Sequence, residues 1–282
     1  MNITIRELTE ADDEQANDLL NLAFESHTNR MNDLRLYHRL QPDGWFKACL
    51  DGRMIGTVGA ISYGDFAHVG FMTVHPDLQG QGIGRMLMEH ILAWLEGQKV
   101  PLVTLDASKK GFPLYENLGF FCVDETMTYV KQIDPVSCEL PEGVQLITPA
   151  DLDELVELDR PIFGADRRKV FQTLIEFYPS RGFMYKDEHG KMTGYLFAYM
   201  NRIGPWVMTD PLGAEDLLKA ALTLEYENPV VVCVPAVNQG AVDLLQAVGF
   251  EKLRGGRHMI KGSTDVPGLR TRIFAQTSMG AG

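Results

Sequence analysis

Residues 74–85 read VHPDLQGQGIGR and form the most informative stretch of the chain. A strand pattern precedes it, and an amphipathic helix pattern follows it, with apolar residues at 86, 87, 91, 92 and 95. Glycines let the backbone approach a ligand closely, and a helix N-terminus offers unpaired N–H groups at the positive end of its dipole. The stretch therefore predicts an anion site suited to a pyrophosphate.

Spacing excludes two common nucleotide-binding signatures. A P-loop ends in Gly-Lys-Ser/Thr, whereas Gly84 is followed by Arg85. A dinucleotide fingerprint, GxGxxG, needs a third glycine where Arg85 or Leu87 stands. The pattern that remains is Gln-x-x-Gly-x-Gly, at Gln79, Gly82 and Gly84.

A second motif lies at residues 114–120, which read LYENLGF. In this order and at this distance, the two motifs resemble the GNAT (GCN5-related N-acetyltransferase) superfamily, whose glycine loop grips the pyrophosphate of acetyl-CoA. The resemblance implies acetyl-CoA (coenzyme A) as the cofactor. It assigns the cofactor contacts to Met72, Thr73, Val74, Gln79, Gly80, Gln81, Gly82, Ile83, Gly84, Arg85, Ser108 and Tyr115. Ser108 stands where the family often has an asparagine, so that contact is weaker or absent here.

The resemblance also implies direct transfer. In the family, the pantetheine arm pairs with the strand before the loop, a backbone N–H near Met72 polarises the thioester, and an amine attacks it without a covalent enzyme intermediate. Tyr115 stands where the family places the acid that protonates the leaving thiolate. His68 stands where histone-acetylating relatives carry a glutamate base. Both residues also have structural readings, because a tyrosine can merely pack and a lone histidine is often a core residue.

Composition bounds the other possibilities. The net charge of −12 argues against binding to nucleic-acid backbones, and it suits either attraction of a cationic amine or simple solubility. No stretch reaches the ~18 apolar residues of a membrane span, and the N-terminal stretch is acidic where a signal peptide is basic. Four scattered cysteines form no metal-ligand pattern. We therefore expect a cytoplasmic protein without metal, membrane or nucleic-acid partners.

Internal similarity indicates that one unit occurs twice. Residues 8–12 (LTEAD) recur as 147–151 (ITPAD), each opening a helical stretch. Residues 101–105 (PLVTL) recur as 229–233 (PVVVC), and each leads through a helix to a similar Gly-Phe pair. A chain of 282 residues has room for two such units.

The first copy predicts an α/β fold, a mixed and mostly antiparallel sheet flanked by helices. Strands are expected at 2–7, 45–50, 54–62, 67–74, 101–106 and 120–131, helices at 12–24, 82–97 and 111–117, and a loop or second helix across 25–40. We expect two tandem GNAT-like domains of this kind, a catalytic domain at 1–137 and a degenerate one at 138–282.

The second copy lacks the features that carry chemistry in the first. The glycine loop is missing after Pro211, and Glu215 and Asp216 stand where they would repel a pyrophosphate. Leu245 replaces the tyrosine, although Asn238 keeps the family's asparagine. The arrangement resembles tandem GNAT proteins with a degenerate C-terminal domain, including the YitH-like group. We therefore expect the second copy to shape the acceptor site or to play a structural role.

Two groups of residues are candidates for facing the acceptor. The first group, in the loop that borders the acceptor pocket in GNAT proteins, is Glu25, His27 and Asn29, and the second is Asp159, Phe163 and Asp166. Helix capping, or interface ion pairs involving Arg160 and Arg167, would explain the same residues equally well.

The sequence thus predicts an N-acetyltransferase that moves an acetyl group from acetyl-CoA to a primary amine, most simply a small molecule. Transfer to a protein N-terminus or to lysine is one alternative, and a noncatalytic acetyl-CoA sensor is another. Retention of Tyr115 favours catalysis, because a sensor needs no acid for a thiolate. The expected assembly is a monomer or a homodimer.

Overall fold

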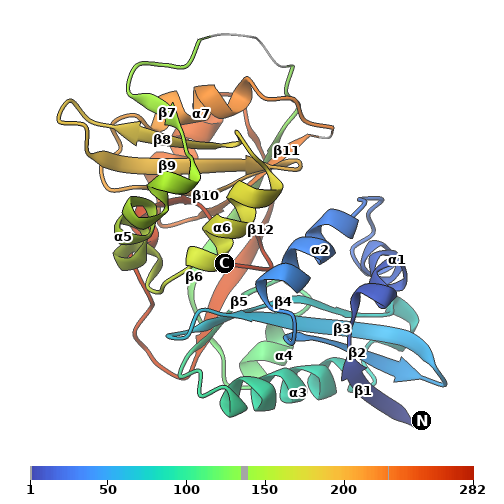
Figure 1. Ribbon diagram of the computed structural model, residues 1–282. Coiled ribbons are helices and arrows are strands. Elements are labelled where there is room, and N and C mark those ends of the chain that lie inside the picture. Colours follow the sequence, from blue (N-terminus) through green and yellow to red (C-terminus); the bar gives the residue numbers. More distant parts are fainter. Residues whose placement is uncertain (1, 135–138, 228) are drawn as a thin grey trace.

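The two halves of the chain share one mixed sheet (Figure 1). The computed structural model describes residues 2–134, 139–227 and 229–282, and within these ranges the sheet has 13 strands. The expected domain boundary at residues 137 and 138 lies outside the described residues.

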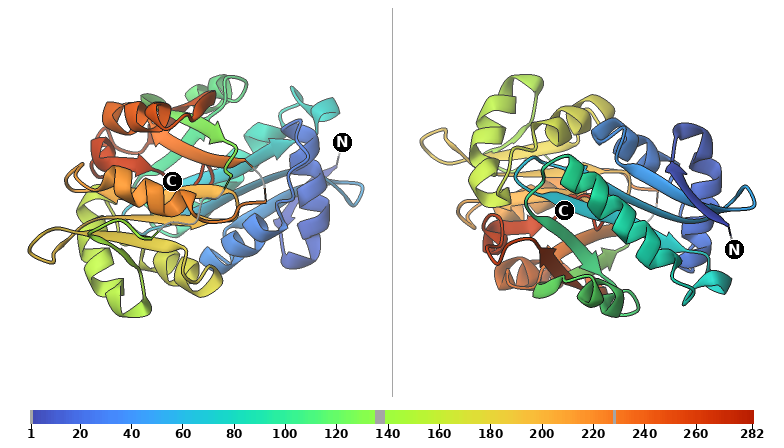
Figure 2. Two further views of the ribbon diagram at one scale, coloured as in Figure 1. Left: turned by 90° about the horizontal axis from the view of Figure 1, so that it is seen from above. Right: turned by 90° about the horizontal axis from the view of Figure 1, so that it is seen from below.

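The first half follows the elements that its sequence predicts. Its strands are β1 (Ile3–Glu7), β2 (Trp45–Leu50), β3 (Arg53–Ser62), β4 (Ala67–Val74), β5 (Val103–Ala107) and β6 (Phe121–Lys131). Its helices are α1 (Asp13–Ala23), α2 (Met31–Leu40), α3 (Ile83–Gly97) and α4 (Phe112–Asn117). The segment expected to hold a loop or a helix therefore contains both. Helices α1 and α2 cover the sheet face toward the second half, and α3 and α4 cover the opposite face (Figures 1 and 2).

The second half repeats this plan. Its strands are β7 (Val144–Leu146), β8 (Gly182–Lys186), β9 (Met192–Tyr199), β10 (Arg202–Met208), β11 (Val230–Pro235), β12 (Glu251–Lys261) and β13 (Ile273–Ala275). Its helices are α5 (Leu152–Phe163), α6 (Arg168–Phe177), α7 (Ala214–Leu222) and α8 (Gln239–Ala247). Helix α6 packs on α2, so the inner helices of the two halves face each other (Figure 1).

The long closing strand of each half is exchanged with the other half. The strand order is β1-β2-β3-β4-β5-β12-β6-β11-β10-β9-β8-β7, with β13 beside β10. Strand β12 pairs with β5, Arg257 lying opposite Ala107, and β6 pairs with β11, Val230 lying opposite Lys131. The two exchanged strands also pair with each other. Instead of the two separate sheets that the duplication suggested, the structure therefore has a single continuous one.

Equivalent local signals start each half. Thr9 and Asp12 form a capping box at a 3-10 turn, η1 (Glu10–Asp12), and Thr148 and Asp151 form another at η3 (Pro149–Asp151). The predicted helix starts are thus confirmed. The β2–β3 turn at 51–52 has φ angles of 50° and 82°, the pair of positive values that a type I′ hairpin turn requires.

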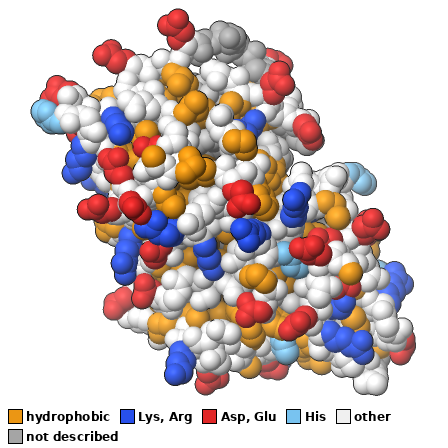
Figure 3. All heavy atoms as spheres, in the orientation of Figure 1, with side chains coloured by type: hydrophobic (Ala, Val, Ile, Leu, Met, Phe, Trp, Pro, Cys, Tyr) orange, Lys and Arg blue, Asp and Glu red, His pale blue; other side chains and the backbone are white. Residues whose placement is uncertain are grey.

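Three hydrophobic clusters fill the molecule. One lies under α3 and α4 in the first half, with Leu87 and Ile91 fully buried. A second lies under α7 and α8 in the second half around Trp206. The third belongs to both halves, because Tyr63 of the first and Phe163 of the second pack in it with ring centroids 4.8 Å apart. This shared cluster fixes the halves against each other, and Figure 3 shows them in contact.

The structure also bears on the predictions about cysteines, membrane spans and metal ligands. Cys49 and Cys233 are buried, Cys122 is exposed, and Cys138 lies outside the described residues. Within the described ranges, no helix is long and apolar enough to cross a bilayer. The same ranges hold no group of three or more side chains placed to ligate a metal.

Candidate active site

A gap opens between the parallel strands β4 and β5 in the first half. Their ladder ends at Val69 and Leu105. From Gly70 onward β4 pairs with β3 alone, so its other edge presents main-chain groups that no described strand uses. The expected pantetheine-binding residues, 72–74, lie on this free edge.

A bulge stands at the start of the free edge. The register between β3 and β4 shifts between Thr57 and Gly59, and Phe71 has a φ angle of 48°. The Thr57 hydroxyl donates to the Phe71 carbonyl at 2.8 Å and so holds this bend. A positive φ in a bulky residue is uncommon, and bulges of this kind re-aim the main chain beside functional sites. The bulge directly precedes Met72.

The glycine loop joins the free edge of β4 to α3. The Gln79 side-chain amide donates to the Val74 carbonyl at 3.0 Å, which folds the loop back onto the end of β4. Gly80 and Gly82 have φ angles of 76° and 86°, and a Cβ on either would meet nothing within 4 Å. Glycine is therefore needed at these two positions for their left-handed φ angles, not for lack of room, and the space above them is open to a ligand.

Gly84 is glycine for a different reason. A Cβ there would lie 3.2 Å from Cε of Met72 and 3.3 Å from Cδ2 of Leu114. Its absence lets the first turn of α3 approach β4 and α4 closely. The glycine loop, the free strand edge and the LYENLGF helix thus meet at one place.

The N-terminus of α3 suits an anion. Gly82 is its N-cap, and the N–H groups of 83–85 have no partner within the helix. The first turn contains no acidic residue, and Arg85 pairs at 3.2 Å with Glu89 one turn on. The positive end of the helix dipole is therefore not neutralised by the helix itself.

Tyr115 and Ser108 converge on Gly111 at the start of α4. A Cβ on Gly111 would lie 3.4 Å from Ser108 Oγ and 3.5 Å from the Tyr115 hydroxyl, and Ser108 Oγ accepts from the Gly111 N–H at 3.1 Å. Burial raises the pKa of Tyr115 to about 12. The phenol therefore keeps its proton throughout the physiological range.

His68 lies on the opposite face of the sheet from α3 and is fully buried. Its Nδ1 is 2.8 Å from the Thr104 hydroxyl, and its Nε2 is 3.3 Å from the Met279 carbonyl. Burial lowers its pKa to about 4, against the opposing effect of Asp106. The neutral ring satisfies both contacts with its proton on Nε2, where it donates to Met279. In this arrangement residues 277–282 separate the proposed base from any incoming amine.

The buried imidazole makes stability depend on pH. Between the folded pKa of about 4 and the ordinary value of 6.5, the unfolded chain binds more protons than the folded one, so stability falls as the pH drops through this window. We expect His68→Gln to remove about 2 kcal/mol of the loss in unfolding free energy between pH 7 and pH 5. Urea unfolding at both pH values measures the loss. His189→Gln, at an exposed histidine, should leave it unchanged.

Asp106 connects His68 to the second half. Its side chain is fully buried, with Oδ2 3.8 Å from His68 Nε2 and Oδ1 3.0 Å from His258 Nδ1. Thr126 donates to Oδ1 at 2.6 Å, and Gln276 donates to Oδ2 at 3.0 Å. Although burial opposes ionisation, His258 and the other partners hold the pKa of Asp106 below its usual range. The exchanged strand β12 thus supplies a partner to this cluster.

The structure places Asp159 and Phe163 beside this region, but with partners of their own. Asp159 accepts from Arg167 Nε and Nη2, both at 2.7 Å, and the two side chains are 1% exposed. The Arg167 guanidinium also lies 4.0 Å from the Phe163 ring centroid. Asp166 is exposed and accepts from the Arg168 N–H at 2.8 Å. The ion-pair and capping alternative therefore describes Asp159 and Asp166, and Phe163 packs against the same guanidinium.

Glu25, His27 and Asn29 lie exposed in the loop between α1 and α2. Asn29 Oδ1 accepts from the Met31 N–H at 3.0 Å, at the start of α2. The structure therefore gives Asn29 a local capping contact, and it leaves Glu25 and His27 on the surface. None of the three contacts the buried cluster around His68.

The gap of the first half has a filled counterpart in the second. The parallel ladder of β10 and β11 ends at Ile203 and Val232, and β13 then pairs with β10, Trp206 lying opposite Ala275. The retained asparagine, Asn238, donates to the carbonyl of Ile273 at 2.9 Å. A strand of the chain itself thus lies where the resemblance puts the pantetheine arm in the first half.

The N-terminus of α7 is covered as well. Its N-cap, Gly213, has a φ angle of 83°, close to that of Gly82, but a Cβ on it would lie 2.4 Å from the Tyr185 ring. Glu215 and Asp216 occupy the first turn. Tyr185 therefore closes the space that stands open above the glycine loop of the first half.

Sequence reasoning missed the buried partners of the predicted residues. Asp106 and His258 are 152 positions apart, and neither stands in a local motif that marks it. Residues 277–282 (TSMGAG) have no periodicity and gave no signal. A polar residue at an inward strand position was the only hint available.

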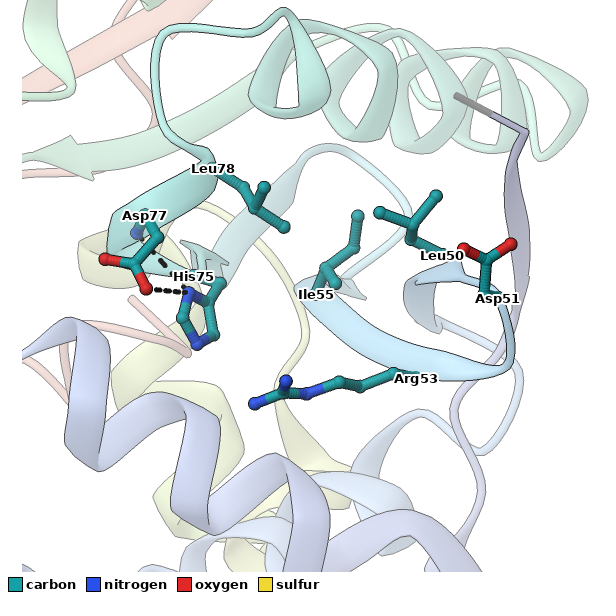
Figure 4. A pocket seen from close by; sticks show the side chains of 7 residues that line it. All are labelled: Leu50, Asp51, Arg53, Ile55, His75, Asp77 and Leu78. Carbon is teal, nitrogen blue, oxygen red and sulfur yellow. Dashed lines mark hydrogen bonds and ion pairs between the residues drawn. The ribbon is translucent and has the colours of Figure 1, made fainter.

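An open pocket of about 450 Å³ lies beside the glycine loop (Figure 4). It is lined by Leu50, Asp51, Arg53, Ile55, His75, Asp77 and Leu78. His75 Nδ1 lies 3.9 Å from Asp77 Oδ2 on its wall. Neither Tyr115 nor His68 lines it, so this pocket is separate from the gap between β4 and β5.

Comparisons with known proteins agree with this geometry. The acetyltransferase (GNAT) family pattern matches residues 7–120, and an acetyltransferase (GNAT) domain pattern matches residues 155–275. The chain is 23% identical to holothin acyltransferase of Pseudoalteromonas sp. (strain SANK 73390), over 89% of this chain and 86% of that protein. It is also 23% identical to the uncharacterised N-acetyltransferase YitH of Bacillus subtilis (strain 168), over 72% of each chain.

Solved structures share the whole fold. A proposed acetyltransferase from Pyrococcus horikoshii superimposes with a TM-score of 0.87 at 24% identity, covering 99% of this chain and 96% of that one. A tandem GNAT protein from the clavulanic acid biosynthesis pathway gives a TM-score of 0.62 at 18% identity, covering 94% of this chain and 100% of that one. Both halves therefore match the same family, and the chain belongs to the GNAT N-acetyltransferases as a tandem GNAT protein.

Proposed function

We propose that this protein transfers an acetyl group from acetyl-CoA to the primary amine of a small molecule. The observation that carries the proposal is the meeting of an uncovered helix N-terminus with an unpaired strand edge, at Gly82–Arg85 and residues 70–74. A diphosphate needs the first, and an amide-bearing arm needs the second. When bound, acetyl-CoA supplies an activated acetyl group, which passes to the amine as the thiol is released.

The residues of the first half have separate tasks in this proposal. The loop amides hold the diphosphate, the β4 edge orients the arm, and Tyr115 holds a proton for the leaving sulfur. His68 takes a proton from the amine at Nε2, the atom that now faces Met279. The Thr104 hydroxyl can donate to Nδ1 or accept from it, so the ring can change tautomer in place.

The second half has a different role in the proposal. Its own gap is filled by β13, its helix N-terminus is covered by Tyr185, and Leu245 stands in place of the tyrosine. We therefore assign cofactor binding and catalysis to residues 1–137 and a degenerate, acceptor-shaping role to residues 138–282. The shared hydrophobic cluster supports that role, because it places α5 and α6 beside the face that carries His68.

Tyr115→Phe tests the proposal. We expect the turnover number for thiol release from acetyl-CoA, over a panel of primary amines, to fall about 100-fold, because general acid catalysis contributes about 100- to 10,000-fold. The Kd for coenzyme A in calorimetry should stay within about twofold. Tyr129→Phe is the matched control, because Tyr129 is a buried tyrosine of β6 that packs in the cluster around Trp206, away from the glycine loop. A wild type that binds coenzyme A yet releases no thiol with any amine would instead favour a sensor.

A further inference from the structure

Residues 277–282 lie between the two halves, where the C end is marked in Figure 1, and all but the half-buried Met279 and Gly280 are buried. Strand β13 ends at Ala275, and the segment beyond it pairs with no strand of the described sheet. Thr277, Ser278 and Ala281 are at most 1% exposed. The segment closes on itself, because the Thr277 N–H donates to the Gly282 carbonyl at 2.8 Å. Residues 277–282 therefore fill the space between the two halves, and no strand ladder holds them in place.

Side chains around the segment bind its main chain. The carbonyls of residues 277, 279 and 281 each meet one group of the surrounding protein. Their partners are, in order, the Tyr199 hydroxyl at 2.6 Å, His68 Nε2 at 3.3 Å and the Tyr63 hydroxyl. Tyr63 and His68 come from the first half and Tyr199 from the second, so the site exists only where the halves meet. Main-chain recognition of this kind does not depend on the ligand's side chains.

The segment's hydroxyl groups are bound as well. Thr277 Oγ1 accepts from Arg167 Nη1 at 3.2 Å, and Ser278 Oγ bonds the Tyr37 hydroxyl. Burial raises the pKa of Tyr37 well above its ordinary value, so this phenol keeps its proton. The surrounding groups therefore offer donors to carbonyl and hydroxyl oxygens.

The segment reaches the gap between β4 and β5. A Cβ on Gly70, the first residue of the free edge, would lie 2.5 Å from Cα of Gly280. A Cβ on Gly256 would lie 3.3 Å from Cε of Met279 and 3.1 Å from the carbonyl oxygen of Ala107, the last residue of β5. Met279 and Gly280 thus lie where an amine must lie to reach a thioester held along β4.

We propose, resting on the function proposed above, that residues 277–282 occupy the acceptor site and that this site takes a short peptide-like amine. The acceptor's amide carbonyls and hydroxyls replace those of the segment. A plain alkylamine would leave the hydroxyls of Tyr37, Tyr63 and Tyr199 and Nη1 of Arg167 without the partners that the segment gives them. Buried polar groups of this kind discriminate strongly against ligands that cannot pair with them. Because the segment lies outside every ladder, it can leave without breaking the sheet.

Binding in trans tests this directly. A variant truncated after Gln276 is titrated against a fluorescently labelled peptide of residues 276–282 (QTSMGAG), and anisotropy is read. We expect saturable binding at least about tenfold tighter than to the full-length protein, whose own segment competes at high effective concentration. Tyr63→Phe in the truncated variant should weaken it about fivefold, because one hydrogen bond is lost. A folded truncated protein that ignores the peptide overturns the proposal.

Kinetics separate this proposal from the function on which it rests. With acetyl-CoA, the truncated variant should use glycylglycinamide with a kcat/KM about tenfold above that for hexylamine, and the peptide should compete with the amine and not with acetyl-CoA. If the protein uses the two amines equally and the peptide does not inhibit it, the acceptor-site proposal is wrong and the acetyltransferase function still holds. If the protein does not bind acetyl-CoA, the acetyltransferase function is wrong, but the anisotropy titration still tests whether the peptide binds the site.

A full-length variant covers the case in which the truncated chain fails to fold. Ala281→Arg puts a charged side chain into a fully buried position and should expel the segment. Thr271→Arg, at an exposed position, is the matched control. We expect fast hydrogen exchange at 277–282 and a lower KM for glycylglycinamide in the first variant only. If Ala281→Arg also unfolds the whole protein, the segment is an essential part of the core and the proposal falls.

Discussion

We expect Gly82→Asp to weaken coenzyme A binding about 1,000-fold while the protein stays folded. The new carboxylate stands at the N-terminus of α3, where two like charges about 4 Å apart cost about 4 kcal/mol at an effective dielectric constant of about 20. The same carboxylate interacts favourably with the helix dipole, and aspartate is among the residues that tolerate a positive φ. Isothermal titration calorimetry with coenzyme A measures the change in Kd.

Gly190→Asp is the control for this experiment. Gly190 has a φ angle of 76°, a Cβ there would meet nothing within 4 Å, and it lies in the turn between β8 and β9. It therefore carries the same backbone strain and the same added charge away from the site. An unchanged Kd in Gly82→Asp would mean that the glycine loop does not hold the diphosphate.

We expect Asp159→Asn to cost about 3 to 5 kcal/mol of unfolding free energy. The substitution keeps the shape of the side chain and leaves the Arg167 guanidinium buried without its counter-charge, which is the costly way to break a buried ion pair. In the native protein burial lowers the pKa of Arg167, and Asp159 outweighs burial and raises it. Without Asp159 the guanidinium still cannot neutralise itself by losing a proton, because arginine stays protonated in proteins. Urea denaturation at pH 7 measures the loss.

Asp153→Asn provides the comparison. Asp153 pairs with Arg168 at 2.8 Å, but its side chain is 91% exposed, so the same chemical change should cost less than about 1 kcal/mol. A loss of stability in Asp159→Asn as small as that in Asp153→Asn would contradict the structural role. It would return Asp159 to the residues that can face an acceptor.

The parts of the site that are local in sequence could be predicted. The glycine loop, the capping threonines and the strand before the loop each depend on a few neighbouring residues, and the structure places them on the expected elements. The duplication could be seen because both copies retain the same start and the same closing Gly-Phe pair. Local propensity and turn chemistry suffice for such features.

The exchange of β6 and β12 could not be predicted. The two strands have the same length and follow equivalent helices, so each could pair with either β5 or β11 without a change in its own pattern. The choice depends on tertiary contacts between residues about 100 or more positions apart. The contact between His68 and Met279 could not be predicted for the same reason, because no residue near either one in the sequence indicates that they meet.

The exchanged strands join the two halves into one continuous structure. Lying between β5 and β6, β12 completes the sheet that carries the glycine loop, and β6 does the same for the other half between β11 and β12. Neither half could drift away by simple hinge bending, since a ladder of main-chain bonds would have to be undone first. The half whose own gap is filled by β13 therefore also supplies a structural strand to the half that carries the glycine loop.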